Sequence, residues 1–255
     1  MKNSIDYVSI IICHYSLPDD HGGLRAVNQK ETRSEMLHTT MESLETNTNY
    51  PCEVIVVDNG KSIEDSNYLL GLVDKGVINT YVRNKNNMYF GWAWNQGARM
   101  ATGKYLCYTC NDIEFYPDWL KKTIQPLIKH PDKRYIATPI IGPEKDNPKY
   151  MREPIDDGYR TNRMSGSNCM LMTRKTADHL GELNTSRTAS YLWYRGKIIP
   201  EEWLMVSPPE NMIHHIANAG GVNINADIKV IKILLNGEEV DYSTKVWNEK
   251  IPIKT

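Results

Sequence analysis

Residues 7–13, Tyr-Val-Ser-Ile-Ile-Ile-Cys (YVSIIIC), form a continuous run of apolar and β-branched side chains. Such a run is typical of a strand that is buried on both faces, as in a parallel sheet. A second run of this kind, Glu53–Val57 (EVIVV), ends at Asp58, and a third, Tyr105–Thr109, ends at Asn111 and Asp112. Three buried strands of this type predict an α/β protein.

Segments with helical spacing of apolar residues alternate with these strands. We expect strands over residues 7–13, 53–57, 77–82, 105–109, 135–141, 169–172 and 228–235. We expect a helix capped by Thr32, and further helices over residues 62–74, 91–102, 117–127, 175–183 and 210–219. Residues 16–30 and 144–164 are expected to be polar loops. Strands that alternate with helices indicate a mostly parallel central sheet flanked by helices.

Bulk properties restrict the class of protein further. The chain has 255 residues, 40% hydrophobic and 24% charged, with a formal net charge of −1, as in a globular domain. No apolar stretch approaches the roughly 18–20 residues that cross a bilayer, so we expect no transmembrane segment and a cytoplasmic protein. The five cysteines include one CxxC pair, Cys107 and Cys110, without a second pair at zinc-finger spacing. We therefore expect these two thiols to pack in and beside a strand.

Polar residues at the carboxyl ends of the predicted strands are candidates for ligand binding, because parallel sheets bind ligands there. They are His14, Tyr15, Asp58, Asn59, Asn84, Asn111 and Asp112. A carboxylate at Asp58 could accept hydrogen bonds from a base or a ribose, or it could cap a turn. Asp112 could hold a divalent cation against a diphosphate, since Mg²⁺ needs only one or two protein carboxylates. It too could be a turn residue.

Two further segments carry candidate residues. Residues 86–97 place Gly91 at a helix start, where a small residue lets the backbone approach a phosphate or a sugar. Trp92 and Trp94 in that segment are expected to pack in the core. Glu210 follows Pro208-Pro209 at a predicted helix start, where a carboxylate could be a cap or a general base. His214 and His215 would follow in the same helix.

Taken in order, these segments resemble the family 2 glycosyltransferases of the GT-A fold. The resemblance runs from about residue 7 to residue 233. It is carried by VSIIICHYS, the helix that begins at Arg33, EVIVVDNGKS, NKNNMYFGWAWNQGARMATGKYL, Cys110-Asn111-Asp112 with EFYPDWL, and SGSNCMLMTR. It implies one GT-A domain over residues 1–235, with a donor half of about 1–115 and an acceptor half of about 116–235. Residues 236–255 would be a C-terminal hairpin or tail.

The resemblance also implies roles for individual residues. Asp58 would touch the nucleoside, Asp112 the metal, and Glu210 would be the catalytic base. On the donor side we also place His14, Tyr15, Asn87, Gly91, Asn95, Asn111 and Lys232. On the acceptor side we place Gly166, Ser167 and Asn168.

The chain departs from the family pattern at three places. The metal motif keeps a single acidic residue, Asp112, and the Glu-Asp pair of the family is reduced to Glu210. Where members often have a late histidine that helps the metal, this chain has Lys232, whose charge could neutralise diphosphate directly. His214 or His215 could instead supply a nitrogen, and we choose His215 as the second metal ligand.

The resemblance implies transfer of a sugar from a nucleotide-diphosphate donor, a UDP-sugar, to an acceptor hydroxyl, with inversion and with Mn²⁺ or Mg²⁺. Retention remains open, and so does the acceptor: a saccharide, a lipid-linked sugar, a protein or a nucleic acid. Two alternatives are a catalytically degenerate binding module and a sugar nucleotidyltransferase. The second would use the glycine-rich segment Gly22–Arg25.

Overall fold

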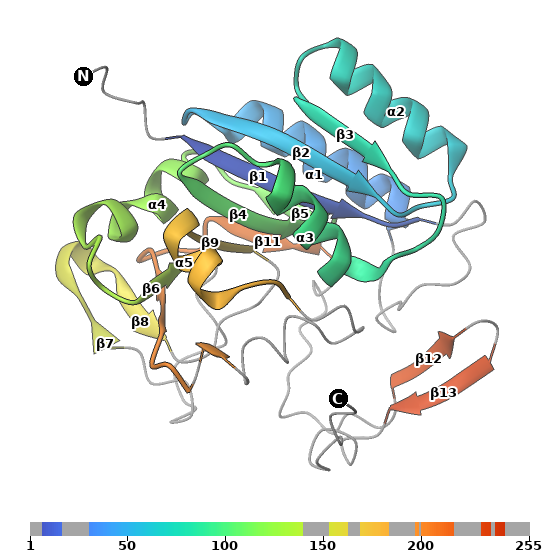
Figure 1. Cartoon of the computed structure of the whole chain (residues 1–255). Helices are drawn as coiled ribbons and strands as arrows, with labels where there is room; N and C mark the ends of the chain where they lie inside the picture. The colour runs from blue at the N-terminus through green and yellow to red at the C-terminus, as the bar shows by residue number, and fades with distance from the viewer. Residues whose placement is uncertain are drawn as a thin grey trace.

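The computed structural model of the chain is a nine-stranded sheet with helices on both faces (Figure 1). It describes residues 7–16, 31–139, 153–162, 169–183, 197–198, 200–216, 231–235 and 238–242. The predicted acceptor-side residues Gly166, Ser167 and Asn168, and the segment Gly22–Arg25, lie outside these ranges.

The order of the sheet is β3-β2-β1-β4-β9-β6-β10-β8-β7. Seven of the nine strands run in one direction, and only β9 and β8 run against them, so the central sheet is mostly parallel as predicted. The strands are β1 (Val8–His14), β2 (Cys52–Asp58), β3 (Thr80–Arg83), β4 (Tyr105–Cys110), β6 (Tyr135–Ala137), β7 (Glu153–Pro154), β8 (Arg160–Asn162), β9 (Cys169–Thr173) and β10 (Leu204–Ser207).

Two small ribbons complete the strand inventory. The strand β5 (Ile113–Phe115) pairs antiparallel with β11 (Ile213–His215), and β12 (Ile231–Leu235) pairs with β13 (Glu238–Tyr242). The last pair in the β12–β13 register is Leu235 with Glu238.

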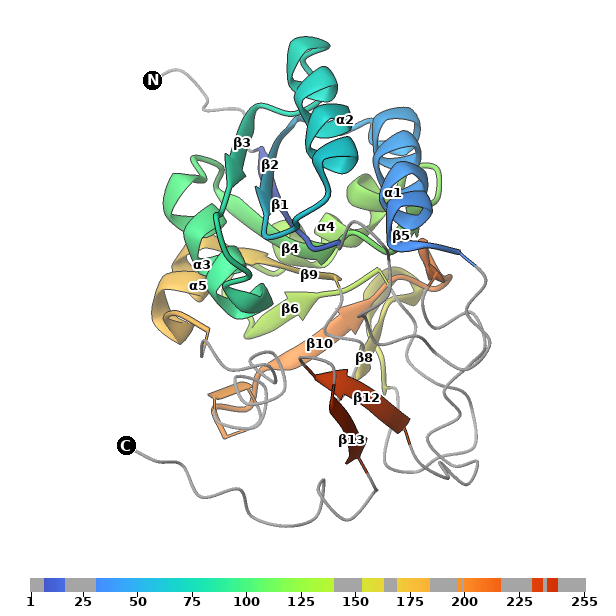
Figure 2. The same cartoon turned by 90° about the vertical axis from the view of Figure 1, so that its right-hand side faces the viewer.

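Alternating side chains of the strands supply two separate cores, one on each face of the sheet (Figure 2). Ile10 and Ile12 of β1 point to the face covered by α1 (Arg33–Asn47), α2 (Ile63–Asp74) and α4 (Trp119–Lys129). Ile11 of β1 points to the opposite face, covered by α3 (Tyr89–Met100) and α5 (Arg174–Leu180). This two-sided burial explains why β1 reads as an uninterrupted apolar run.

Local sequence signals define several helix ends. Thr32 caps α1 in a capping box: its side chain accepts from Glu35 N, and the Glu35 side chain accepts from Thr32 N. Ser62 caps α2 by accepting from Asp65 N. In α4, Pro126 has no N–H for the carbonyl of Lys122, and the hydroxyl of Tyr159 donates to that oxygen instead, at 2.7 Å.

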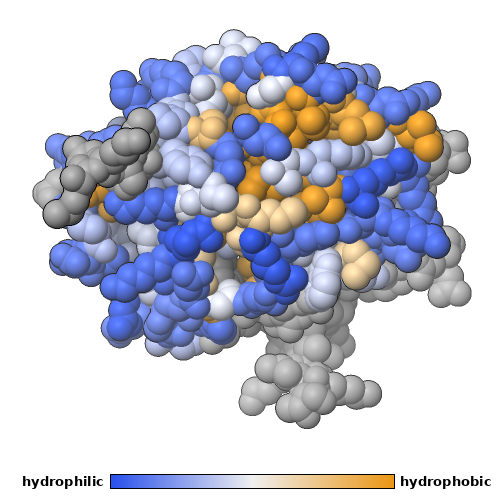
Figure 3. Space-filling model, turned by 45° about the horizontal axis from the view of Figure 1, so that its top comes forward, coloured by the Kyte–Doolittle hydropathy of each residue, from blue (hydrophilic) through white to orange (hydrophobic). Residues whose placement is uncertain are grey.

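Apolar side chains also gather in a band on the face that carries α2 (Figure 3). Ile63 and Leu70 are exposed there, whereas Leu69 and Leu72 of the same helix pack into the core. The helix α2 is therefore apolar on two sides, and only the inner side contributes to folding.

Three predicted elements differ from the structure. The helix expected over residues 210–219 is wrong, because Ile213–His215 is strand β11. Its pairing with β5, together with burial of Ile213, outweighs the local signal of the proline pair. The expected loop 144–164 contains β7, β8 and the 3₁₀ helix η2 (Asp156–Gly158). The strand expected to reach residue 141 is described only as Tyr135–Ala137.

Candidate active site

The candidate site lies at the carboxyl ends of β1 and β4, where the strand order reverses. From β1 the chain adds β2 and β3 on one side and then crosses to add β4 on the other. The crevice at such a reversal is the usual ligand site of an open α/β sheet. His14 is the last residue of β1 and Tyr15 follows it, and Asn111 and Asp112 directly follow β4.

Asp112 and His215 are brought together from distant parts of the sequence. The β5–β11 ribbon places His215 opposite Ile113, directly after Asp112. Nε2 of His215 lies 3.0 Å from Oδ2 of Asp112, and the two side chains are 16% and 22% exposed. The backbone adds a further link, since Ile216 N donates to Asp112 O at 2.8 Å.

The second carboxylate oxygen of Asp112, Oδ1, is buried and has no hydrogen-bond partner among the described residues. A buried carboxylate oxygen without a donor is costly, and native proteins rarely leave one unpaired. A divalent cation would satisfy it, and carboxylate oxygen with imidazole nitrogen is a donor set that suits Mn²⁺. Oδ1 of Asp112 therefore fits a metal, and His215 would be a second ligand once Nε2 no longer carries the proton that it donates to Oδ2. Within the described part of the chain, no group of three or more His, Cys, Asp or Glu side chains is arranged around one metal position.

His14 and Asn111 contact one another across the crevice. Nδ1 of His14 lies 2.9 Å from Nδ2 of Asn111, and both side chains are buried. On its other side, His14 Nε2 lies 3.1 Å from the hydroxyl of Ser16 and 3.4 Å from Oδ2 of Asp65. The side chains of His14 and Asn111, which the sequence predicted to lie on the side of the sugar donor, thus contact other side chains of the protein.

Asp58 is only 1% exposed, and both of its oxygens accept hydrogen bonds. Oδ1 accepts from Gly60 N at 2.7 Å, and Oδ2 accepts from the hydroxyls of Ser66 at 2.8 Å and Tyr81 at 2.7 Å. Gly60 has little room for a side chain, because a Cβ there would lie 2.9 Å from Asp58 Oδ1 and 3.0 Å from Ser16 N. Asp58 therefore holds the loop that follows β2.

The loop after β3 is fixed by amide side chains. Asn59 donates to Tyr89 O at 3.2 Å, and Asn87 Oδ1 accepts from Tyr89 N at 2.8 Å. Tyr89 begins α3 with a φ of 62°, a left-handed conformation that non-glycine residues seldom adopt. Gly91 follows as a buried residue of that helix. Backbone strain of this kind is often found at ligand-binding loops.

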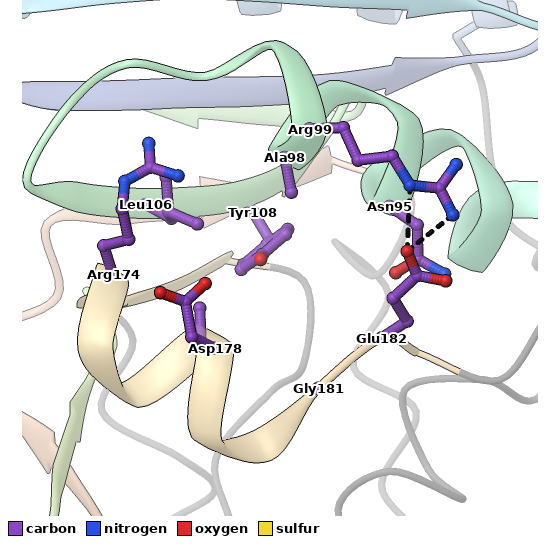
Figure 4. A pocket seen from close by; sticks show the side chains of 10 residues that line it. Asn95, Ala98, Arg99, Leu106, Tyr108, Arg174, Asp178, Gly181 and Glu182 are labelled. Carbon is purple, nitrogen blue, oxygen red and sulfur yellow. Dashed lines mark hydrogen bonds and ion pairs between the residues drawn. The ribbon is translucent and has the colours of Figure 1, made fainter.

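Asn95 lies farther along α3 and joins that helix to the segment that follows α5. Its amide donates to Leu183 O at 2.8 Å and accepts from Leu183 N at 2.9 Å. It borders a cavity of about 360 Å³ between α3, β4 and α5, where Arg99 and Glu182 form an ion pair (Figure 4). The structure thus gives Asn95 a bracing contact on the α3 face of the sheet.

Glu210 is not brought together with Asp112 and His215. Its carboxylate is 61% exposed and pairs with Lys122 of α4 at 2.5 Å. It precedes the Ile213 end of β11, whereas Asp112 adjoins the His215 end of the same ribbon. With the predicted helix absent, the helix dipole no longer supports a base at Glu210. Lys232 lies in β12 opposite Asp241, and its predicted donor contact stays a prediction.

The cysteines beside the site are neutral thiols. Burial, with the nearby charges of Asp58 and Asp112, raises the pKa of Cys13 to about 12. Burial, with the charge of Asp112, also raises the pKa of Cys110 well above its ordinary value. Cys107 points to the opposite core from Cys110, because three residues in a strand reverse the face. The CxxC pair therefore cannot close on one metal ion.

Arg33 is a cation at this rim that the sequence did not single out as a candidate site residue. Arg33 begins α1, donates from Nη1 to Tyr15 O at 3.2 Å and lies over the Tyr15 ring at 5.6 Å. Arg33 lies 18 residues after Tyr15 in the sequence, so the sequence alone could not show that it contacts the end of β1. A guanidinium there is suited to bind phosphate oxygens.

Comparisons with known proteins give the same class. The family model "Glycosyl transferase family 2" matches residues 27–199, well over half of the chain. The chain belongs to glycosyl transferase family 2, and the fold expected from the sequence, that of the GT-A glycosyltransferases, is confirmed.

Individual relatives are more distant. A putative polypeptide N-acetylgalactosaminyltransferase 13 of Drosophila melanogaster is 27% identical over 129 residues, which are 44% of this chain and 22% of the relative. Two solved structures share the fold. One is GalNAc-T7 with UDP, GalNAc and Mn²⁺, with a TM-score of 0.56, 14% identity, and 84% and 44% of the two chains covered.

The other is the mannosyltransferase PcManGT of Pyrobaculum calidifontis with GDP-Man and Mn²⁺. Its TM-score is 0.53 at 16% identity, and 80% of this chain and 55% of that chain are covered. The chain thus spans about half or less of the length of each of these relatives. Within the described residues, no helix is long and apolar enough to cross a membrane.

Proposed function

We propose that this chain transfers a sugar from a nucleotide-diphosphate donor, a UDP-sugar, to an acceptor hydroxyl, with a divalent cation held by Asp112 and His215. The observation that carries the proposal is the unpaired Oδ1 of Asp112 beside the imidazole of His215 at the strand reversal. Both solved relatives contain a nucleotide ligand and Mn²⁺, which supports the same ligand classes here.

The chain's own residues would perform most of the binding work. Arg33 would contact the diphosphate with its guanidinium, while the loop fixed by Asn59 and Asn87 would border the donor. A bound cation would offset the negative charge that builds on the departing diphosphate. The acceptor hydroxyl would then attack the anomeric carbon from the opposite side while the bond from that carbon to the diphosphate oxygen breaks. The hydroxyl proton would leave to solvent, the nucleotide diphosphate would depart, and the configuration would be inverted.

The first test is ligand binding by the wild-type chain. A thermal-shift panel of UDP, GDP and their common sugar conjugates, with and without Mn²⁺, should raise the melting temperature most for a UDP ligand with Mn²⁺. A response to GDP alone would correct the base, since the two solved relatives carry different nucleotides. No response to any nucleotide would contradict the proposal and favour a binding module that takes other ligands.

The second test separates Asp112 from ordinary surface charge. Asp112→Asn and His215→Gln should abolish the Mn²⁺-dependent part of the shift and the Mn²⁺-dependent release of UDP from the donor. Glu114→Gln is the matched control, because Glu114 lies in β5 two residues from Asp112 and its removal costs the same charge. Equal UDP release by wild type and Asp112→Asn would favour a degenerate module. Pyrophosphate formed from a nucleoside triphosphate and a sugar phosphate would favour a nucleotidyltransferase.

A further inference from the structure

A buried chain of hydrogen bonds runs from α2 through β1 to the turn that carries Asp112. Asp65, in the first turn of α2, is nearly inaccessible to solvent. Its Oδ1 accepts from the Ser34 hydroxyl of α1 at 2.5 Å, and its Oδ2 accepts from the Ser16 hydroxyl and lies 3.4 Å from His14 Nε2. One carboxylate thus joins α1, α2 and the end of β1.

The charge on this carboxylate is stabilised by its partners. Burial alone would raise the pKa of Asp65, but hydrogen bonds from His14, Ser16 and Ser34 outweigh it and hold the pKa well below 3.8. Asp65 is therefore ionised across the range in which glycosyltransferases are assayed. An ionised carboxylate accepts hydrogen bonds only, so every group that faces it must donate.

This requirement fixes the protonation pattern of His14. Its Nε2 faces Asp65 and Ser16 and carries the proton, while its Nδ1 accepts from Nδ2 of Asn111 at 2.9 Å. A carboxylate that holds one imidazole nitrogen sets the tautomer and the orientation of the ring. The ring in turn holds the Asn111 side chain toward β1, and Asn111 immediately precedes Asp112.

We propose that Asp65, acting through His14 and Asn111, is a positioning residue for the Asp112–His215 pair. The chain fixes the turn between β4 and β5, so that Asp112 meets His215 with Oδ1 left over for a ligand. This inference rests on the proposed function, because it assigns a purpose to the geometry of the proposed metal site.

The test removes the two ends of this chain of hydrogen bonds, Asp65 and Asn111, in separate variants. In Asp65→Ala, affinity for Mn²⁺ in the presence of UDP, measured by calorimetry, should fall about tenfold, as expected for a residue that orients a metal ligand. Glu64→Ala is the matched control: it removes an exposed carboxylate from the same first turn of α2 and should leave the affinity within about twofold. Equal affinity of Asp65→Ala and wild type would overturn the proposal.

A second variant keeps the test decisive if Asp65→Ala does not fold. Asn111→Ala cuts the chain beside Asp112 without touching its anchor in α1 and α2, and should weaken Mn²⁺ binding by a similar factor. If Asp65→Ala and Asn111→Ala both fold, the double variant should bind Mn²⁺ no more weakly than whichever single variant binds it less tightly. The reason is that both substitutions break the same chain of hydrogen bonds. Additive losses would show that the residues act separately and would overturn the proposal.

A spectroscopic readout distinguishes this inference from the proposed function. In ¹⁵N-histidine-labelled protein, His14 should be the Nε2–H tautomer, and Asp65→Ala should change the His215 imidazole signals while Glu64→Ala does not. If wild type binds neither Mn²⁺ nor UDP, the proposed function fails but these signals still decide the positioning claim. A mixed His14 tautomer in wild type, or unchanged His215 signals in Asp65→Ala, would refute it.

Discussion

Asp58 and Asp112 both follow a buried strand, yet the structure uses their carboxylates in different ways. Asp58 accepts three hydrogen bonds within the protein and is almost inaccessible to solvent. Asp112 accepts from His215 at one oxygen, and its other oxygen has no hydrogen-bond partner within the part of the chain that the structure describes. A buried carboxylate whose oxygens all accept hydrogen bonds stabilises a loop, whereas one with an oxygen that accepts none can bind a ligand there. Both carboxylates lie at a strand end, and they differ only in how many hydrogen-bond donors surround them.

Asp112→Asn should give the largest effect on activity and the clearest difference between activity and stability. We expect Mn²⁺-dependent release of UDP to fall by about a hundredfold or more, because the cation loses a charged ligand. The free energy of unfolding should change by about 1 kcal/mol or less, because the amide oxygen of Asn can still accept from His215 Nε2 and Oδ1 has no hydrogen-bond partner to lose among the described residues. Steady-state kinetics and urea unfolding measure the two effects. A large loss of stability with normal kinetics would make Asp112 a structural residue like Asp58.

Asp58→Ala should show the reverse pattern in the free energy of unfolding. It leaves Gly60 N and the hydroxyls of Ser66 and Tyr81 without their acceptor, at a cost of about 3 kcal/mol. Urea unfolding at neutral pH measures this. Thr80→Ala in the adjacent strand β3 is the control, because Thr80 is not one of the residues that donate to Asp58. If Asp58→Ala is as stable as wild type but binds UDP poorly, the nucleoside contact predicted from the sequence is the better account.

Asp65 allows a test by pH. Its folded pKa is lowered, so the unfolded chain takes up a proton first as pH falls. The stability that Asp65 contributes is therefore complete above its ordinary pKa of 3.8 and is lost as pH falls below it toward the folded pKa. We expect Asp65→Ala to cost about 2 kcal/mol at pH 7 and progressively less toward pH 3. Unfolding of both proteins over this range measures it, and a difference independent of pH would contradict it.

Glu210→Gln should give the smallest effect. The Lys122–Glu210 pair is exposed on both sides, and such pairs contribute about 0–1 kcal/mol. Release of UDP should stay within about threefold of wild type, because Glu210 lies away from the Asp112–His215 pair. Lys122→Gln should match it in both stability and rate. A loss of activity in Glu210→Gln alone would restore the general base predicted from the sequence.

Local sequence was sufficient for the elements whose signals are local or repeated. The apolar run of β1, the capping box of Thr32 and Glu35, and the N-cap Ser62 each specify a segment through its own side chains. The strand–helix alternation indicated the mostly parallel sheet, and the sheet directed attention to the rim formed by the carboxyl ends of its strands. Asp112 and His215 could be chosen as candidates by the resemblance to the family, although nothing in the sequence places them in contact.

Tertiary structure decided the rest, because the deciding contacts join residues far apart in the chain. A three-residue segment such as Ile213–His215 takes its conformation from its partner β5, and a proline pair upstream cannot specify it. Whether a carboxylate is free depends on donors from other elements: Tyr81 and Ser66 reach Asp58, Ser34 reaches Asp65, and none reaches Oδ1 of Asp112 among the described residues. The sequence by itself determined where polar groups gather, and packing determined which of them remain able to bind.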